Sequence, residues 1–245
     1  MAVSATKPQK ILLPDIDWVE IPAGLFIYGE GEEQQEIDLD LFQISRYPIT
    51  NSQYQCFIDA GGYEEERWWQ DLIKPEPEKS TWEQPNRPRT DVDWYEAVAF
   101  TRWLSAQLNQ PIRLPTEQEW EKAARDADGR QYPWGNEYIN GYANVDESEE
   151  KGEYLKQTTA VGLYPLDKSP YGVRDMAGNV WEWCLNKYKH PEQIEPDTSG
   201  DSRVLRGGSW IYNPGNARAA NRYRDLPDYR NYDGGFRVVL SAPIS

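Results

Sequence analysis

The chain has 245 residues, among them 11 Trp and 16 Tyr, and a formal net charge of -15. So acidic a surface repels a phosphate backbone, which argues against nucleic acid as a partner. Two cysteines, Cys56 and Cys184, exclude a disulfide framework, and the single histidine, His190, disfavours mechanisms that need several histidines.

Residues 1–16 are expected to form an N-terminal tail, and residues 17–245 a single domain. No apolar run is long enough for a signal peptide or a membrane span, so we expect a cytoplasmic protein without membrane contact. Two short apolar runs around Pro22-Ala23-Gly24 predict a β-hairpin. A further strand follows, and then a short helix that starts near Thr50 or Asn51 and ends at Gly61-Gly62.

Two longer helices are predicted after a Pro-rich surface loop over residues 74–89. Asp93 and Glu96 form a capping pair at the start of the first helix, and Thr116 and Glu119 form a capping box at the start of the second. Beyond residue 130 helical periodicity ends, and short strands alternate with loops rich in Gly, Pro and Asn. This pattern predicts an α+β domain in which loops carry the function.

Six sequence motifs then stand in order: RLPTEQEWEKAAR, YPWGNE, ANV, YGVRDMAGNVWEWC, RVLRGGSW and GGFRVV. With them the chain resembles the formylglycine-generating-enzyme (sulfatase-modifying factor) family, from about Trp18 to the end. The resemblance implies a C-type-lectin-like fold with two main helices, short antiparallel strands and long ordered loops. Trp181 and Trp183 can share one face of an extended segment, and with Phe236 we expect them mainly to pack in the core.

The oxidase branch of this family holds copper with two cysteines shortly after the GGS motif, because soft thiolates select Cu(I). Tyr212 and Ala217 occupy these positions here, and Cys56 and Cys184 lie elsewhere, where we expect small buried hydrophobic side chains. A second branch builds an iron site from histidines of an added helical domain. The resemblance therefore implies neither copper nor iron, and we expect no enzymatic activity.

A third branch comprises the variable proteins of diversity-generating retroelements, which bind ligands through the segment between GGSW and GFR. Mutagenesis of template adenines turns an Asn codon into Tyr, Asp, Ile or Leu codons but never into Lys, Glu, Gln, Met or Trp codons. Residues 211–234 contain none of these five residue types. The candidate ligand-binding positions are those that are Asn or can derive from it: Ile211, Tyr212, Asn213, Tyr223, Asp225, Leu226, Tyr229, Asn231, Tyr232 and Asp233.

We therefore expect a non-enzymatic variable protein that binds a macromolecule, most simply a protein, through residues 211–234. Tyrosine offers large contact area at low entropic cost, and Asn and Asp offer adaptable hydrogen bonds, as in antibody paratopes. Three alternatives stay open. The chain could be an atypical oxidoreductase of the family, a fixed pseudo-enzyme scaffold, or an inactive member with an ordinary loop of this composition.

The resemblance also implies structural calcium, which prefers carboxylate and carbonyl oxygens. The implied ligands fall on two segments: Asn144 and Val145, with others near Glu153 and Tyr154, and then Asp175, Gly178, Val180 and Glu182. The alternative is that Glu182 only hydrogen-bonds the backbone of a loop.

Overall fold

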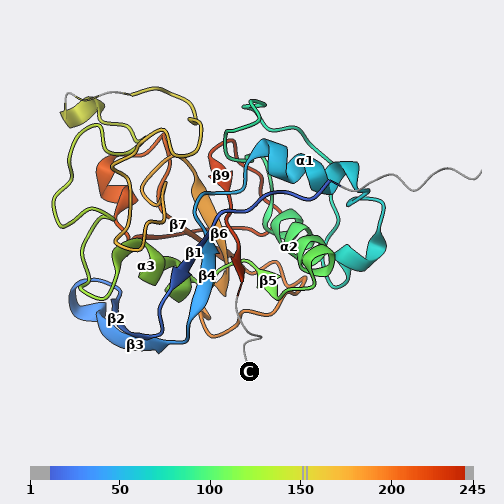
Figure 1. Ribbon diagram of the computed structural model, residues 1–245, viewed down its shortest axis with the longest axis horizontal. Helices are drawn as coiled ribbons and strands as arrows, with labels where there is room; N and C mark the ends of the chain where they lie inside the picture. Colours follow the sequence, from blue (N-terminus) through green and yellow to red (C-terminus); the bar gives the residue numbers. More distant parts are fainter. Residues whose placement is uncertain (1–11, 151, 153, 241–245) are drawn as a thin grey trace, which may run out of the picture.

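The computed structural model describes residues 12–150, 152 and 154–240 (Figure 1). Its α-helices are α1 (Asn51–Asp59), α2 (Trp94–Leu108) and α3 (Glu117–Arg125). Short 3-10 helices lie at Gly31–Glu33, Glu66–Trp69, Ser148–Glu150 and Pro214–Ala217. Most of the predicted N-terminal tail falls outside the described residues, but Ile16 is buried and joins the core.

The strands of the described chain form small sheets, which confirms the α+β class. One sheet has the order β1 (Trp18–Ile21), β4 (Phe42–Ser45), β10 (Val239–Leu240), β5 (Ile112–Arg113). A separate ribbon pairs β2 (Gly24–Tyr28) with β3 (Gln35–Leu39). The third sheet has the order β8 (Arg222–Asp225), β7 (Arg203–Arg206), β6 (Trp181–Lys187), β9 (Gly234–Gly235). The β6–β9 pairing is parallel, whereas the other strand pairs of the described chain are antiparallel, as expected.

The three α-helices begin where their capping residues predict. Thr50, Asp93 and Thr116 are the N-caps, and each forms a complete capping box with the residue three positions later. Each box satisfies backbone N–H groups that would otherwise lack partners in the first turn. The first of these boxes places the start of α1 at Asn51, which resolves the choice between Thr50 and Asn51.

The predicted hairpin around Pro22-Ala23-Gly24 is wrong. β1 pairs with β4, where Val19 and Ile21 pack into a buried cluster, whereas β2 pairs with β3. At Gly24 the backbone adopts a φ of 130°, and the carbonyl of this residue accepts a hydrogen bond of 2.7 Å from Lys122 Nζ of α3. Pairing with partners distant in the sequence thus replaces the local pairing that the two apolar runs indicated.

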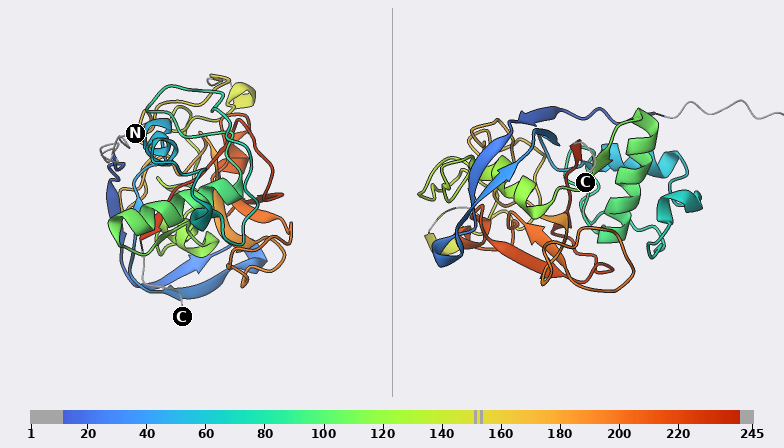
Figure 2. Two further views of the ribbon diagram at one scale, coloured as in Figure 1. Left: turned by 90° about the vertical axis from the view of Figure 1, so that its right-hand side faces the viewer. Right: turned by 90° about the horizontal axis from the view of Figure 1, so that it is seen from below.

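Aromatic packing joins the helices to the third sheet. Helices α1 and α2 lie together on one side of the molecule, while α3 and the β2–β3 ribbon lie on the other (Figure 1 and Figure 2). Phe236 is fully buried and contacts Phe100 of α2 at 5.4 Å between ring centroids, as expected of a core anchor. Trp181 and Trp183 of β6 belong to the same buried cluster. No helix of the described residues has the length and apolar character needed to cross a bilayer.

Candidate ligand-binding site

Most of the candidate ligand-binding positions reach the surface. Tyr223, Leu226, Tyr229 and Tyr232 are 42%, 51%, 49% and 41% exposed. Asn213 is also exposed, and partial exposure is shared by Ile211, Tyr212, Asp225 and Asn231. Their participation in binding stays a prediction.

Asp233 differs from the other candidates, because it is only 2% exposed. Its Oδ2 accepts a hydrogen bond of 2.6 Å from Ser209 Oγ, and its backbone carbonyl accepts one of 2.8 Å from Trp181 N. The parallel pairing of β9 with β6 holds this residue beneath the surface. Asp233 is therefore corrected from an exposed position to a buried support of the site.

The loop after β8 is fixed to the start of α2. Trp94 N donates to the carbonyl of Pro227 at 3.0 Å, and Asp91 N donates to the carbonyl of Asn231 at 3.0 Å. Arg230 forms an ion pair of 2.8 Å with the buried carboxylate of Glu96. These contacts hold the exposed side chains of the loop on a fixed frame.

The backbone of the GGSW turn packs closely against the backbone at Ala217. Gly207 and Gly208 have φ values of 97° and 76°. A Cβ on Gly208 would meet the backbone of Ala217 at 3.0 Å, closer than most real Cβ contacts come. Glycine is favoured at this position because the positive φ and the close backbone both disfavour a side chain.

Seven rings form what we call the aromatic surface: Trp82, Tyr154, Trp181, Trp210, Tyr212, Tyr223 and Tyr232. In one half, Trp181 stacks on Tyr223 at 5.2 Å and meets Tyr212 edge-on at 5.8 Å. The other half surrounds Trp210, with centroid distances of 5.6 Å to Tyr232, 6.2 Å to Tyr154 and 6.4 Å to Trp82. These distances fall in the range of favourable ring contacts.

Four of the buried polar atoms that lack a hydrogen-bond partner among the described residues lie at the aromatic surface, and others lie elsewhere in the core. Four buried indole N–H groups have no hydrogen-bond partner among the described residues, and three of them belong to Trp82, Trp181 and Trp210. Asp233 Oδ1 is a buried acceptor that likewise has no hydrogen-bond partner among the described residues. Each such group costs about 1–3 kcal/mol.

Burial controls the titration of the polar groups here. It raises the pKa of Tyr212 to about 12, with further contributions from Tyr223, Asp233 and Tyr232. Burial likewise raises the pKa of the Asp233 carboxyl. Tyr212 is therefore a neutral phenol at physiological pH, able to donate a hydrogen bond.

Four members of the aromatic surface are not among the predicted ligand-binding positions: Trp82, Tyr154, Trp181 and Trp210. Trp181 was expected mainly to pack in the core. Trp82 and Tyr154 lie far from the C-terminal segment in sequence, and no spacing pattern connects them to it. Trp210 lies in the GGSW motif itself, but it looks like an ordinary core residue because most of its ring is buried. A search for large aromatics flanking the predicted variable region could have found Trp210 alone.

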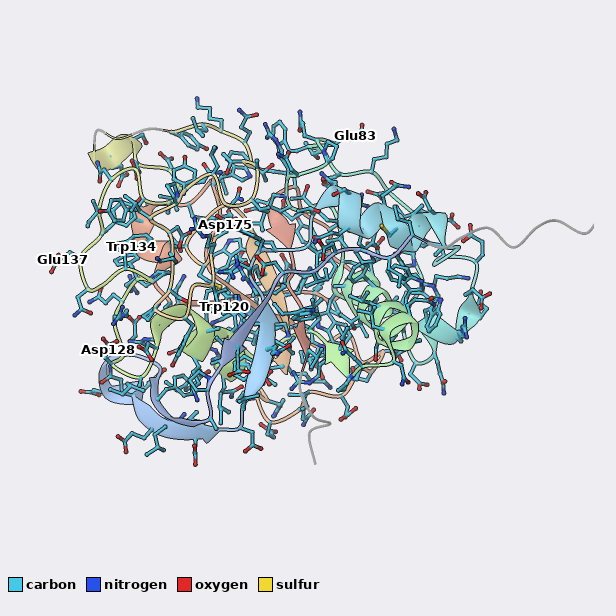
Figure 3. The ribbon with its side chains drawn as sticks, in the orientation of Figure 1. Glu83, Trp120, Asp128, Trp134, Glu137 and Asp175 are labelled. Carbon is cyan, nitrogen blue, oxygen red and sulfur yellow. The ribbon has the colours of Figure 1, made fainter. Side chains whose placement is uncertain are left out.

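The residues implied for the second calcium segment do not fit a cation. Glu182 accepts hydrogen bonds from Arg237 Nε at 2.5 Å, Arg237 Nη2 at 2.8 Å and Trp120 Nε1 at 2.7 Å. Asp175 Oδ2 accepts a bond of 2.7 Å from Gly162 N, and burial raises the pKa of this carboxyl to about 6. Trp120 and Asp175 both lie in the interior (Figure 3). The guanidinium of Arg237 supplies the positive charge that Glu182 requires in this structure. Because Arg237 and Trp120 bind Glu182 through their side chains, the backbone-only alternative is wrong.

Backbone contacts also occupy the other implied calcium positions. Gly178 and Val180 are buried, and a Cβ on Gly178 would lie 2.4 Å from the carbonyl oxygen of Asn144. That carbonyl accepts a bond of 2.8 Å from Asn179 N, and Val145 packs in a small buried cluster. The further position Glu153 lies outside the described residues. In this structure the implied ligand atoms are thus engaged in other contacts. Calcium binding remains a prediction.

The positions of the copper ligands in the oxidase branch contain no thiol. Ala217 is fully buried and Tyr212 belongs to the aromatic surface. Cys56 and Cys184 are free and buried in different clusters, and burial raises the pKa of both thiols, in agreement with their predicted packing role. The described residues contain no group of three or more His, Cys, Asp or Glu side chains suited to a metal ion.

Comparison with known proteins identifies relatives of this chain. Residues 4–242 match the family model for the sulfatase-modifying factor enzyme 1-like domain. Hercynine oxygenase of Mycobacterium tuberculosis is 34% identical, over 85% of this chain and 52% of that protein. The inactive C-alpha-formylglycine-generating enzyme 2 of Mus musculus is 30% identical, over 91% of this chain and 85% of that protein. The chain spans about half the length of the oxygenase relatives that it matches.

Solved structures share the fold. Variable protein 1 of Treponema denticola has a TM-score of 0.73 at 23% identity, with 96% of this chain and 98% of that chain covered. PvdO from Pseudomonas aeruginosa has a TM-score of 0.75 at 24% identity, with 97% and 100% covered. The expectation that the chain is no enzyme is contradicted, because the hercynine oxygenases are enzymes. The chain belongs to the sulfatase-modifying factor enzyme 1-like family, with its formylglycine-generating-enzyme architecture.

Proposed function

We propose that this chain is a substrate-binding domain of an oxidoreductase, and that the aromatic surface binds a small organic substrate. The observation that carries the proposal is the gathering of unpaired indole N–H groups at stacked rings. Ring faces combined with a few convergent polar groups are typical of small-molecule sites. The oxygenase relatives, 33–34% identical, support a redox function for the whole protein.

Each part of the aromatic surface has a distinct task in this proposal. The exposed ring of Tyr223, which stacks on the buried Trp181, holds an apolar or cationic part of the substrate, because aromatic faces attract both. The indole N–H groups of Trp181 and Trp210 are buried beneath Tyr223 and Tyr232, so they donate to acceptors of the substrate only when these tyrosine rings are displaced. These residues bind and orient the substrate, and no metal ligand is assigned to them.

The experiment is a calorimetric titration of the protein with hercynine, the compound in the relatives' name. We expect Tyr223→Ala to weaken binding at least about tenfold, because the ring stacked on Trp181 is lost. Tyr229→Ala is the matched control, since Tyr229 is similarly exposed and has no ring contact among the described residues. Its affinity should stay within about twofold of the wild type.

Two results would contradict the proposal. One is the absence of binding heat for hercynine at millimolar concentration. The other is an equal loss of affinity in the Tyr223 and Tyr229 variants, because only the first ring belongs to the aromatic surface.

A second function, recognition of a macromolecule through a diversified surface, is favoured by the exposure of Leu226 and Tyr229 outside the aromatic surface. It predicts that Tyr229→Ala weakens capture of a protein partner, and that sibling genes differ at the candidate positions. An Asn-rich template repeat and a reverse transcriptase gene beside the coding sequence would support it. Identical residues at these positions in all sibling genes would exclude it.

A further inference from the structure

Strand β8 presents a second, chemically different face opposite the aromatic surface. Side chains alternate along a strand, so Tyr223 turns toward Trp181 while Arg222 and Arg224 turn toward Tyr188. The second face borders a pocket of about 440 Å³ between β8, the end of β6 and the loop before β7. Its polar lining comprises Lys187, Lys189, His190, Asp201, Ser202 and Arg224.

Cationic side chains outnumber carboxylates in the lining of this pocket. The lining contains three cationic side chains and one carboxylate, on a chain whose net charge is -15. Lys187 bridges Asp197 and Asp201 at 2.7 and 2.8 Å, so its own charge is already compensated. Together with the hydrogen bond of 2.8 Å from Tyr188 N to the carbonyl of Ser202, this bridge fixes the loop against β6.

Two cations of the pocket stay available. Within the described part of the chain, neither Lys189 nor Arg224 forms an ion pair. The guanidinium of Arg224 lies 4.8 Å from the Tyr188 ring centroid, and its N–H groups form no hydrogen bond within the described residues. Its in-plane N–H groups remain suited to paired hydrogen bonds with an oxyanion. Arg222 on the same face differs, because Glu117 binds it through two hydrogen bonds of 2.5 and 2.9 Å.

We propose that this pocket binds the phosphate group of a small molecule. Arg224 supplies paired N–H donors, Lys189 supplies a second charge, and Ser202 and His190 lie in the wall as hydrogen-bonding groups. A phosphate ion alone would fill only part of about 440 Å³, so a small phosphate monoester fits the pocket better. The site is separate from the aromatic surface and holds whether or not that surface binds hercynine.

Calorimetric titration at low ionic strength tests the site with two probes, glycerol 3-phosphate and inorganic phosphate. We expect the monoester to bind the more tightly. Arg224→Gln and Lys189→Gln should each weaken its affinity at least about fivefold, because each removes a charge-assisted hydrogen bond. Arg224→Lys should recover only part of the loss, since an ammonium cannot form the paired bonds.

The matched control is Lys79→Gln, which removes one positive charge from an exposed loop residue outside the pocket. It should change the affinity less than about twofold, because exposed charges are screened. Absence of binding for both probes would overturn the proposal, as would equal losses in the Lys79 and Arg224 variants. Binding of inorganic phosphate with the same variant pattern would support it and identify the free ion as a sufficient ligand.

Discussion

Removal of Glu182 is expected to destabilise the protein more than most single changes. The Glu182→Ala variant leaves the fully buried Arg237 guanidinium without its carboxylate, and Trp120 Nε1 without its acceptor. The remaining bonds of Arg237 reach only carbonyl oxygens, including those of Ser45 at 3.0 Å and Arg174 at 3.0 Å. An uncompensated buried charge costs about 3–5 kcal/mol. For a domain of this size, that loss lowers the melting temperature by about 10 °C.

Urea unfolding followed by tryptophan fluorescence measures this loss, in a chelator and again in millimolar calcium. The double variant Glu182→Leu/Arg237→Met removes both charges, and we expect it to recover at least about 2 kcal/mol of the single variant's loss. A loss below about 1 kcal/mol in Glu182→Ala would refute the reasoning. So would a loss that appears only when calcium is present, because Glu182 would then act as a calcium ligand.

Two further predictions concern backbone conformation and pH. Gly208→Ala should destabilise the protein by about 2 kcal/mol or more in the same urea assay, because φ is positive and the new Cβ meets backbone. In the control variant Gly215→Ala the new Cβ meets no backbone atom within 4 Å, so the loss should be less than about 1 kcal/mol. Burial raises the pKa of Asp175 from 3.8 to about 6, so the folded state binds the extra proton and wild-type stability falls as pH rises through this window. Asp175→Asn keeps an acceptor for Gly162 N and has no carboxyl to titrate. Its stability relative to wild type should therefore increase by about 2–3 kcal/mol as the pH is raised from 4 to 7. A stability difference that does not change with pH would contradict this assignment.

Local signals in the sequence predicted the helices well. The capping boxes at Asp93 and Thr116 satisfy the helix's own backbone groups, so they act whatever the rest of the chain does. Pairing of strands is a tertiary property, and the β1–β2 hairpin failed because β1 buries its apolar face against β4 instead. Two adjacent apolar runs carry no information about such a distant partner.

The site was partly predictable for the same reason. Exposure of Tyr223 and Tyr232 agrees with their place in a tyrosine-rich segment, but the burial of Asp233 depends on its hydrogen bond to Ser209 and on the β9–β6 pairing. The ion pair of Glu182 with Arg237 joins residues 55 positions apart, so a motif that suggested calcium ligands contained no sign of the competing guanidinium.

The most direct test of the proposed binding site is the chemical shift of the indole N–H groups in a 15N–1H correlation spectrum. Hercynine should move the signals of Trp181 and Trp210, whose N–H groups lack acceptors among the described residues. The signals of Trp94 and Trp120 should stay in place, because these donors already bind the Cys184 carbonyl and the Glu182 carboxylate. Saturating hercynine that leaves the Trp181 and Trp210 signals unmoved would contradict the account.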